Sequence, residues 1–173
     1  MKLLPISEVD RYFLPELAQA LFSKEISALS PEQIVCIQEL LGKKPPRLTG
    51  NDTKDLASQL LWMLYKPRRE GVTWNVLAKR AFLESTALWR LKNKIIDLWK
   101  GKEMPLFGWD IIHSISFAAV DNHPTPEFLL WWRSLRRLYE DAFEEYGSAS
   151  KKIPTVRIAQ LSPVRPKELA QIK

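Results

Sequence analysis

Residues 71–94 restrict the fold more than any other stretch of this chain, because they predict two short helices separated by a tight turn. Small or apolar residues stand at the positions that two crossing helices bury: Leu77, Ala78, Leu83, Leu88, Leu91 and Ile95. In the second helix these residues recur three or four positions apart, which places them on one face. The pattern is typical of a helix-turn-helix, a unit whose second helix enters the major groove of DNA.

The opposite face of the second helix is polar. It is expected to present Glu84, Ser85, Thr86, Trp89, Arg90, Asn93 and Lys94. Glu84 or Ser85 can cap the amide groups at the start of this helix. Serine, threonine, arginine, asparagine and lysine form hydrogen bonds with base edges and with phosphates. This face is therefore a candidate nucleic-acid interface.

The same stretch resembles the repressor-type (Xre, lambda-repressor-like) helix-turn-helix family, in the run Leu-Ala-Lys-Arg-Ala-Phe-Leu-Glu-Ser-Thr-Ala-Leu-Trp-Arg-Leu. The resemblance covers residues 71–94, or 53–120 with the flanking helices, and implies a helical bundle that binds specific DNA sequences. Trp74 stands where the family often has a glutamine that touches phosphate. Phe82 stands where the family usually has a turn glycine, and a bulky residue at positive φ is unfavourable.

The distribution of charge separates four segments of the chain. Residues 66–102 hold ten Lys or Arg against three Asp or Glu, a net charge of +7. Residues 1–65 carry −1, residues 103–146 carry −5 and residues 147–173 carry +5. A basic cluster of this kind is the electrostatic footprint expected for a phosphate backbone, although a solvated basic surface has the same composition.

These observations predict two sets of DNA contacts. The residues expected to read bases in the major groove are Ser85, Thr86, Trp89, Arg90 and Asn93. The residues expected to bind phosphates are Arg68, Arg69, Thr73, Lys79, Arg80, Lys92 and Lys94. The expected function is a DNA-binding protein that acts as a transcriptional regulator, with double-stranded DNA as its partner.

The whole chain is predicted to be all-α, a multi-helix bundle with a basic C-terminal tail. The other helices are predicted at residues 7–28 with a break near Pro15, 30–42, 51–66, 106–120 and 126–146. Pro67 is expected to stop the third of these and Gly147 the last. The expected organisation is an N-terminal helical segment over residues 1–48, a helical domain over 51–146 and a mobile tail over 147–173.

Seven tryptophans support a second interpretation, a helical adaptor subunit that binds another protein, or RNA within a nucleoprotein assembly. Trp131 and Trp132 are adjacent, so a helix cannot bury both on one face. One of the two is therefore expected to be exposed or to lie in an interface, either with a partner or in a homodimer. The adaptor and DNA-binding interpretations are compatible if the acidic segment mediates dimerisation.

The sequence gives little support to an enzyme. His113 is expected in a helix core and His123 in a surface loop, and no phosphate loop, metal-helix signature or nucleophile elbow is present. Cys36 lies among apolar residues, which favours an inert buried thiol. We expect no cofactor and no metal. No apolar run is long enough for a membrane helix and the start does not resemble a secretory signal, so a cytoplasmic protein is expected.

Overall fold

The computed structural model describes residues 8–102 and 108–150, and this part of the chain contains helices and loops without a strand. The elements are α1 (Glu8–Phe22), the 3-10 turn η1 (Ile26–Ala28), α2 (Pro31–Leu40), α3 (Asp52–Arg69), α4 (Trp74–Arg80), α5 (Ser85–Trp99), α6 (Trp109–Ala119) and α7 (Pro126–Ser150). Over these residues the all-α prediction is confirmed. None of the helices described has the length and apolar character needed to cross a membrane.

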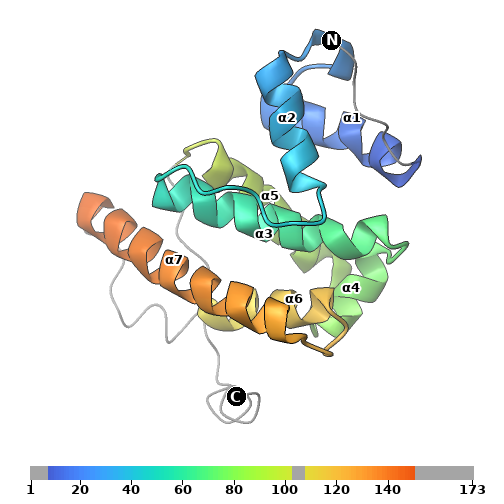
Figure 1. Cartoon of the computed structure of the whole chain (residues 1–173). Helices are drawn as coiled ribbons and strands as arrows, with labels where there is room; N and C mark the ends of the chain where they lie inside the picture. Colours follow the sequence, from blue (N-terminus) through green and yellow to red (C-terminus); the bar gives the residue numbers. More distant parts are fainter. Residues whose placement is uncertain (1–7, 103–107, 151–173) are drawn as a thin grey trace.

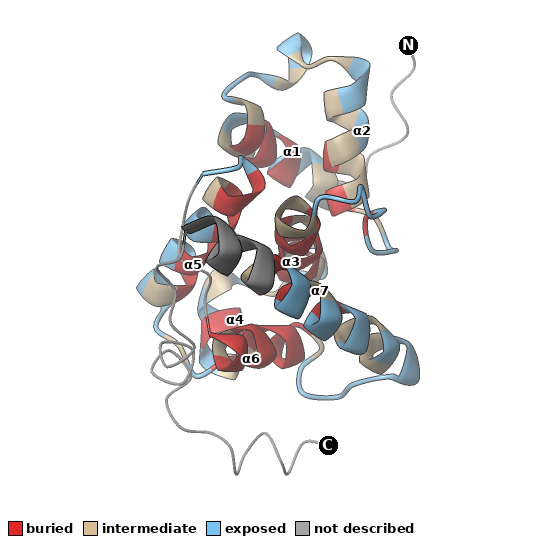
Figure 2. Ribbon diagram, turned by 90° about the vertical axis from the view of Figure 1, so that its left-hand side faces the viewer, coloured by how far each residue is buried: buried red, intermediate tan, exposed pale blue. Residues whose placement is uncertain are grey.

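Helix α3 is the centre of the molecule. Residues 59–65 are all buried, which is nearly two helical turns, so every side of the helix is covered there. Helices α2, α5, α6 and α7 all pack on it, and Figure 1 shows α3 running through the middle with α1 and α2 at one end. Buried residues of α3 and α6 appear in red in Figure 2, whereas the outer side of α7 is exposed. The buried side chains of α1 and α2 belong to the same core cluster.

Polar residues define where the helices begin. Ser30 and Gln33 form a capping box at α2, in which each side chain accepts from the other residue's backbone N–H. The Asn51 side chain accepts from the N–H of Lys54 at the start of α3. The buried Asp55 carboxylate accepts four hydrogen bonds from three donors: the N–H of Thr49, which reaches both oxygens, the Thr49 hydroxyl and the N–H of Gly50. These bonds hold the linker from α2 against α3.

Three predicted helix ends are wrong. The first helix ends at Phe22, because Ser23 adopts a positive φ of 54°, and Pro15 lies inside it without a break. Helix α3 continues past Pro67 to Arg69, since packing and the Arg69 side chain hold its last turn. Helix α7 continues past Gly147 to Ser150, because a glycine inside a helix costs only about 1 kcal/mol. The remainder of the predicted tail lies outside the described residues.

Candidate nucleic-acid interface

Helices α4 and α5 are joined by a turn that combines two helix-end signals. The Thr73 hydroxyl accepts from the N–H of Val76 and caps α4. At the other end Phe82 has a φ of 59°, and the N–H of Leu83 donates to the Ala78 carbonyl over 2.8 Å. This six-residue closure is a Schellman turn, which normally carries glycine at the left-handed position. The turn geometry is therefore present although phenylalanine replaces the glycine.

Helix α5 has one buried face and one exposed face. The buried residues are Leu88, Leu91, Lys92, Ile95, Ile96, Leu98 and Trp99. The exposed residues at its beginning and along its outer side are Glu84, Ser85, Thr86, Trp89, Arg90, Asn93 and Lys94. The polar face predicted from the residue spacing thus faces solvent, with no described helix lying over it.

The five predicted base-reading residues share this exposed surface. The Ser85 hydroxyl donates to the Asn75 side-chain oxygen over 2.5 Å, which ties the start of α5 to α4. Neither Glu84 nor Ser85 forms the expected capping bond: the side chain of Glu84, which occupies the capping position, makes no such bond, and Ser85 is turned toward Asn75. Arg90 and Asn93 lie further along the same face.

Lys92 does not have the surroundings predicted for a phosphate ligand. Its side chain is only 3% exposed, and its ammonium lies 3.0 Å from the Glu16 carboxylate. The ammonium also lies 3.4 Å from the centre of the Trp89 ring. Glu16 accepts a second hydrogen bond from the Tyr65 hydroxyl, at 3.1 Å. Lys92 therefore neutralises a carboxylate between α1 and α5, because a buried ammonium requires a paired charge.

Arg68 and Arg69 were also predicted to bind phosphate, and both are used inside the fold. The Arg68 guanidinium lies between two rings, 4.7 Å from the centre of Phe13 and 4.8 Å from that of Trp74. The Arg69 guanidinium donates to the carbonyls of Leu41 and Gly42. Arg69 thereby satisfies the two carbonyls that directly follow the end of α2 and anchors this end of the helix to α3. The prediction that these two side chains face a ligand is wrong.

The remaining predicted phosphate ligands are Thr73, Lys79, Arg80 and Lys94. Thr73, Lys79 and Lys94 are exposed. Arg80 is partly buried, and its guanidinium lies 3.2 Å from the Asp121 carboxylate in the loop between α6 and α7. The cations free to meet a ligand on α4 and α5 are therefore Lys79, Arg90 and Lys94.

Exposed apolar side chains lie on the same two helices and their turn, and the sequence did not predict that all of these apolar side chains are exposed. Val76 is 44% exposed, Phe82 78% and Trp89 49%. Val76 lies one residue before Leu77, the middle residue of α4, and is apolar by type, so only its position relative to the buried Leu77 could have placed it outside. Phe82 could have been found from the turn position that it occupies.

Trp131 and Trp132, the predicted interface residues, are both partly buried. The Trp131 ring lies 5.5 Å from Trp62 of α3, and its indole N–H donates to Gln59. The Trp132 ring lies 5.6 Å from Trp109 of α6. Neither ring is fully exposed, because α7 lies across both α3 and α6 and adjacent residues reach different helices. That one of the two lies in an interface stays a prediction.

The candidate reactive side chains lie away from this surface. His113 is 5% exposed and stacks on Phe117, with ring centres 4.5 Å apart, as expected for a core histidine. Burial raises the pKa of the Cys36 thiol, which favours its unreactive protonated form. Within the described part of the chain, no three His, Cys, Asp or Glu residues gather as a metal site requires.

Comparisons of the chain with protein-family models, with curated proteins and with solved structures find no match. The resemblance of residues 71–94 to repressor-type proteins stays a prediction.

Proposed function

We propose that this protein binds double-stranded DNA by placing α5 in the major groove, and that it acts as a cytoplasmic transcriptional regulator of the helix-turn-helix type. The observation that supports this most directly is the joint exposure of Ser85, Thr86, Trp89, Arg90 and Asn93 along one side of α5. The helix has 15 residues, hence a length of about 22 Å. The major groove of DNA is about 12 Å wide and admits an α-helix that lies in it.

The exposed residue types match the chemistry of base edges. Arg90 can donate two hydrogen bonds to guanine, and Asn93 can pair with adenine, each worth about 1–3 kcal/mol of discrimination. The Trp89 ring is held over the Lys92 ammonium, so its exposed part is a fixed apolar surface suited to a thymine methyl group. Lys79 and Lys94 flank these residues and can contact phosphates on either side of the groove.

The test is selection of bound sequences from a pool of random DNA duplexes, followed by affinity measurements over a range of salt concentrations. Binding should weaken steeply between about 50 mM and 200 mM salt, because phosphate contacts release counterions. The Arg90→Ala variant should lose preference for the selected sequence. Arg133→Ala removes the same charge from the exposed side of α7 and serves as the matched control. Absence of any enriched sequence, together with equal effects of the two variants, would contradict the proposal.

A second candidate function is a helical adaptor that binds a protein, or RNA in a nucleoprotein assembly. The exposed Val76, Phe82 and Trp89 favour it, because aromatic residues concentrate in protein interfaces and stack on unpaired bases. Competition at equal concentrations separates DNA binding from RNA binding: single-stranded RNA displaces most of the duplex DNA only if it binds the same surface more tightly. Phe82→Ser should weaken adaptor binding, whereas duplex DNA affinity should change little because Phe82 lies in the turn.

A further inference from the structure

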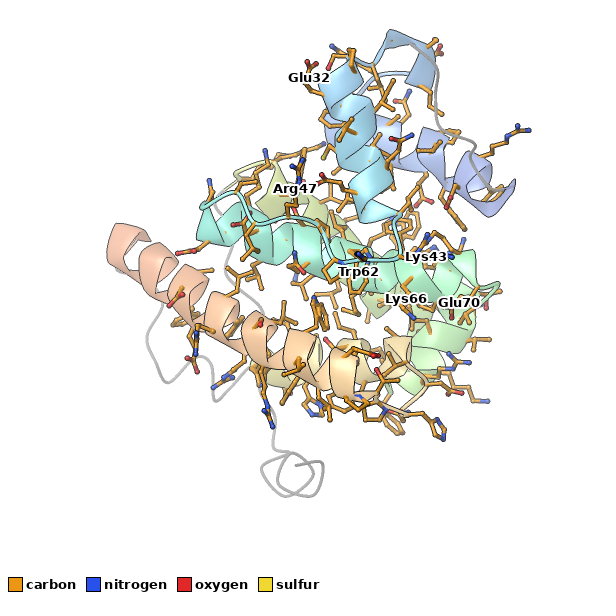
Figure 3. All side chains as sticks on the ribbon, viewed as in Figure 1. Glu32, Lys43, Arg47, Trp62, Lys66 and Glu70 are labelled. Atoms are coloured by element: carbon orange, nitrogen blue, oxygen red, sulfur yellow. The ribbon has the colours of Figure 1, made fainter. Side chains whose placement is uncertain are left out.

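An open cavity of about 770 Å³ lies on the molecule between the linker after α2, the second half of α3 and the loop from α6 to α7. Figure 3 shows four of its lining residues, Lys43, Trp62, Lys66 and Glu70, where the chain leaving α2 meets α3. Small-molecule sites typically have volumes of roughly 300–1,000 Å³. The cavity is therefore large enough to hold a compact organic ligand.

Three aromatic rings line one part of this cavity. Trp131 lies between the other two, with its ring centre 5.5 Å from Trp62 and 5.6 Å from Phe128. Both indole N–H groups are already satisfied: Trp62 donates to the Gly42 carbonyl and Trp131 to the Gln59 side chain, each over 2.8 Å. These bonds fix the orientation of the rings. What the rings offer a ligand is consequently apolar aromatic surface, which favours a flat ring.

The charged residues of the lining are not all neutralised within the protein. Lys66 pairs with Glu70 at 3.3 Å, and Arg80 pairs with Asp121 at 3.2 Å. Lys43 and Lys44 are exposed at the cavity, and no carboxylate of the described residues pairs with either one. The linker edge therefore carries two free ammonium groups.

Glu127, on the α7 side of the lining, is the remaining acidic residue there. With the two ion pairs set aside, Lys43 and Lys44 outnumber it, so the free charge of the lining is positive. An anion is attracted to such a site, and an ammonium–carboxylate or ammonium–phosphate contact is stronger than a neutral hydrogen bond.

We infer that this cavity binds a small aromatic anion, with its flat ring against Trp62, Phe128 and Trp131 and its anionic group at Lys43 and Lys44. A carboxylate and a phosphate monoester both satisfy this chemistry. The site is separate from the exposed face of α5, and the inference does not depend on DNA binding. Its test uses the full chain without nucleic acid.

Isothermal titration calorimetry with three probes tests the site: naphthalene-2-carboxylate, its neutral carboxamide and adenosine monophosphate. At least one of the two anions should bind with one-to-one stoichiometry. Where naphthalene-2-carboxylate is the tighter of the two anions, its neutral carboxamide should bind at least about tenfold more weakly than the carboxylate. Preference for the nucleotide would instead identify a phosphate ligand. Saturation by neither anion in the millimolar range would overturn the inference.

Two double variants with the same loss of charge locate the binding. Lys43→Gln with Lys44→Gln should weaken the better anion by about three- to tenfold, because both ammonium groups are exposed and partly screened by solvent. Lys24→Gln with Lys100→Gln removes two exposed lysines that do not line the cavity, and should leave affinity unchanged. Equal weakening by both pairs would show that the anion responds only to net charge and would overturn the site. Phe128→Leu should also weaken binding of both anions, because it removes one of the aromatic rings that line the cavity.

Discussion

Lys92 and Lys94 belong to one helix and one basic segment, yet they end in opposite surroundings. Lys92 is buried beside Glu16, whereas Lys94 is exposed on the outer side of α5. The same division separates Arg68 and Arg69, which hold α1 and α2 in place, from Lys79 and Arg90. A local charge of +7 therefore overstates the positive charge that a phosphate backbone can meet, because part of it stabilises the fold.

The largest expected difference between these two groups is in stability. Lys92→Ala should lower the free energy of unfolding by about 2–3 kcal/mol, because it leaves the partly buried Glu16 carboxylate without its cation and removes the contact with Trp89. Lys94→Ala should change it by less than about 0.5 kcal/mol. Urea unfolding of both variants measures the comparison. Similar losses of stability at the two positions would contradict the conclusion that Lys92 stabilises the fold and Lys94 does not.

The next largest expected effect is a loss of stability at high pH that is caused by Tyr65, which donates a hydrogen bond to Glu16. Burial, reinforced by the Glu16 carboxylate, raises the pKa of Tyr65. In the unfolded chain a tyrosine ionises near pH 10, so above this pH the folded state retains a proton that the unfolded state has lost. The free energy of unfolding should then fall, by up to about 1.4 kcal/mol per pH unit for this group.

Urea unfolding from about pH 9 to about pH 11 follows this loss. Tyr65→Phe should make the decline shallower, while Tyr12→Phe, at an exposed position, should leave it as in the parent protein. Some decline persists in Tyr65→Phe, since burial raises the pKa of Tyr139 to about 12. An unchanged slope in Tyr65→Phe would mean that Tyr65 does not carry the effect.

The exposed Lys79 and Lys94 should contribute to the affinity for duplex DNA rather than to the stability of the fold. Lys79→Ala and Lys94→Ala should each lower duplex affinity by about three- to fivefold for all sequences alike, and reduce the salt slope by about one. Lys24→Ala, an exposed lysine in the loop after α1, provides the control. Fluorescence anisotropy at several salt concentrations gives both quantities. If Lys24→Ala has the same effect, α5 is not the surface that meets phosphate.

The smallest expected effect lies in the turn that joins the two helices. Phe82 has a positive φ of 59° and is mostly exposed. Phe82→Gly should raise the free energy of unfolding by about 0.5–1 kcal/mol, because glycine adopts this conformation without steric cost. Phe82→Ala keeps a Cβ atom and should give no such gain. Thermal unfolding distinguishes them, and equal stability of the two variants would show that the turn is not strained.

Much of the fold followed from periodicity and capping signals. The stripe of Leu88, Leu91 and Ile95 predicted the buried face of α5, and Ser30 with Gln33 predicted the start of α2. Pro67 and Gly147 misled the prediction of helix ends. Their local preferences were overridden in α3, where Pro67 is itself buried, and in α7 by a helix that tolerates one glycine.

The candidate site was only partly predictable, and Lys92 shows why. It stands four residues after Leu88 and three before Ile95, so helical spacing alone places it on the buried face. Residue type argued the other way, and the deciding partner, Glu16, lies far away in the sequence. The cavity beside Trp62 was not predicted at all, because it forms where three separate segments meet and none of them has a recognisable motif.

The position of α3 also has a consequence for synthesis on the ribosome. This helix is complete at Arg69, but α7, which covers one of its sides, does not begin until Pro126. The nascent chain must therefore carry an uncovered strip of leucine and tryptophan until nearly all the helices have been made. Over that interval it is open to aggregation and to capture by chaperones, and truncation before α7 should leave an insoluble product.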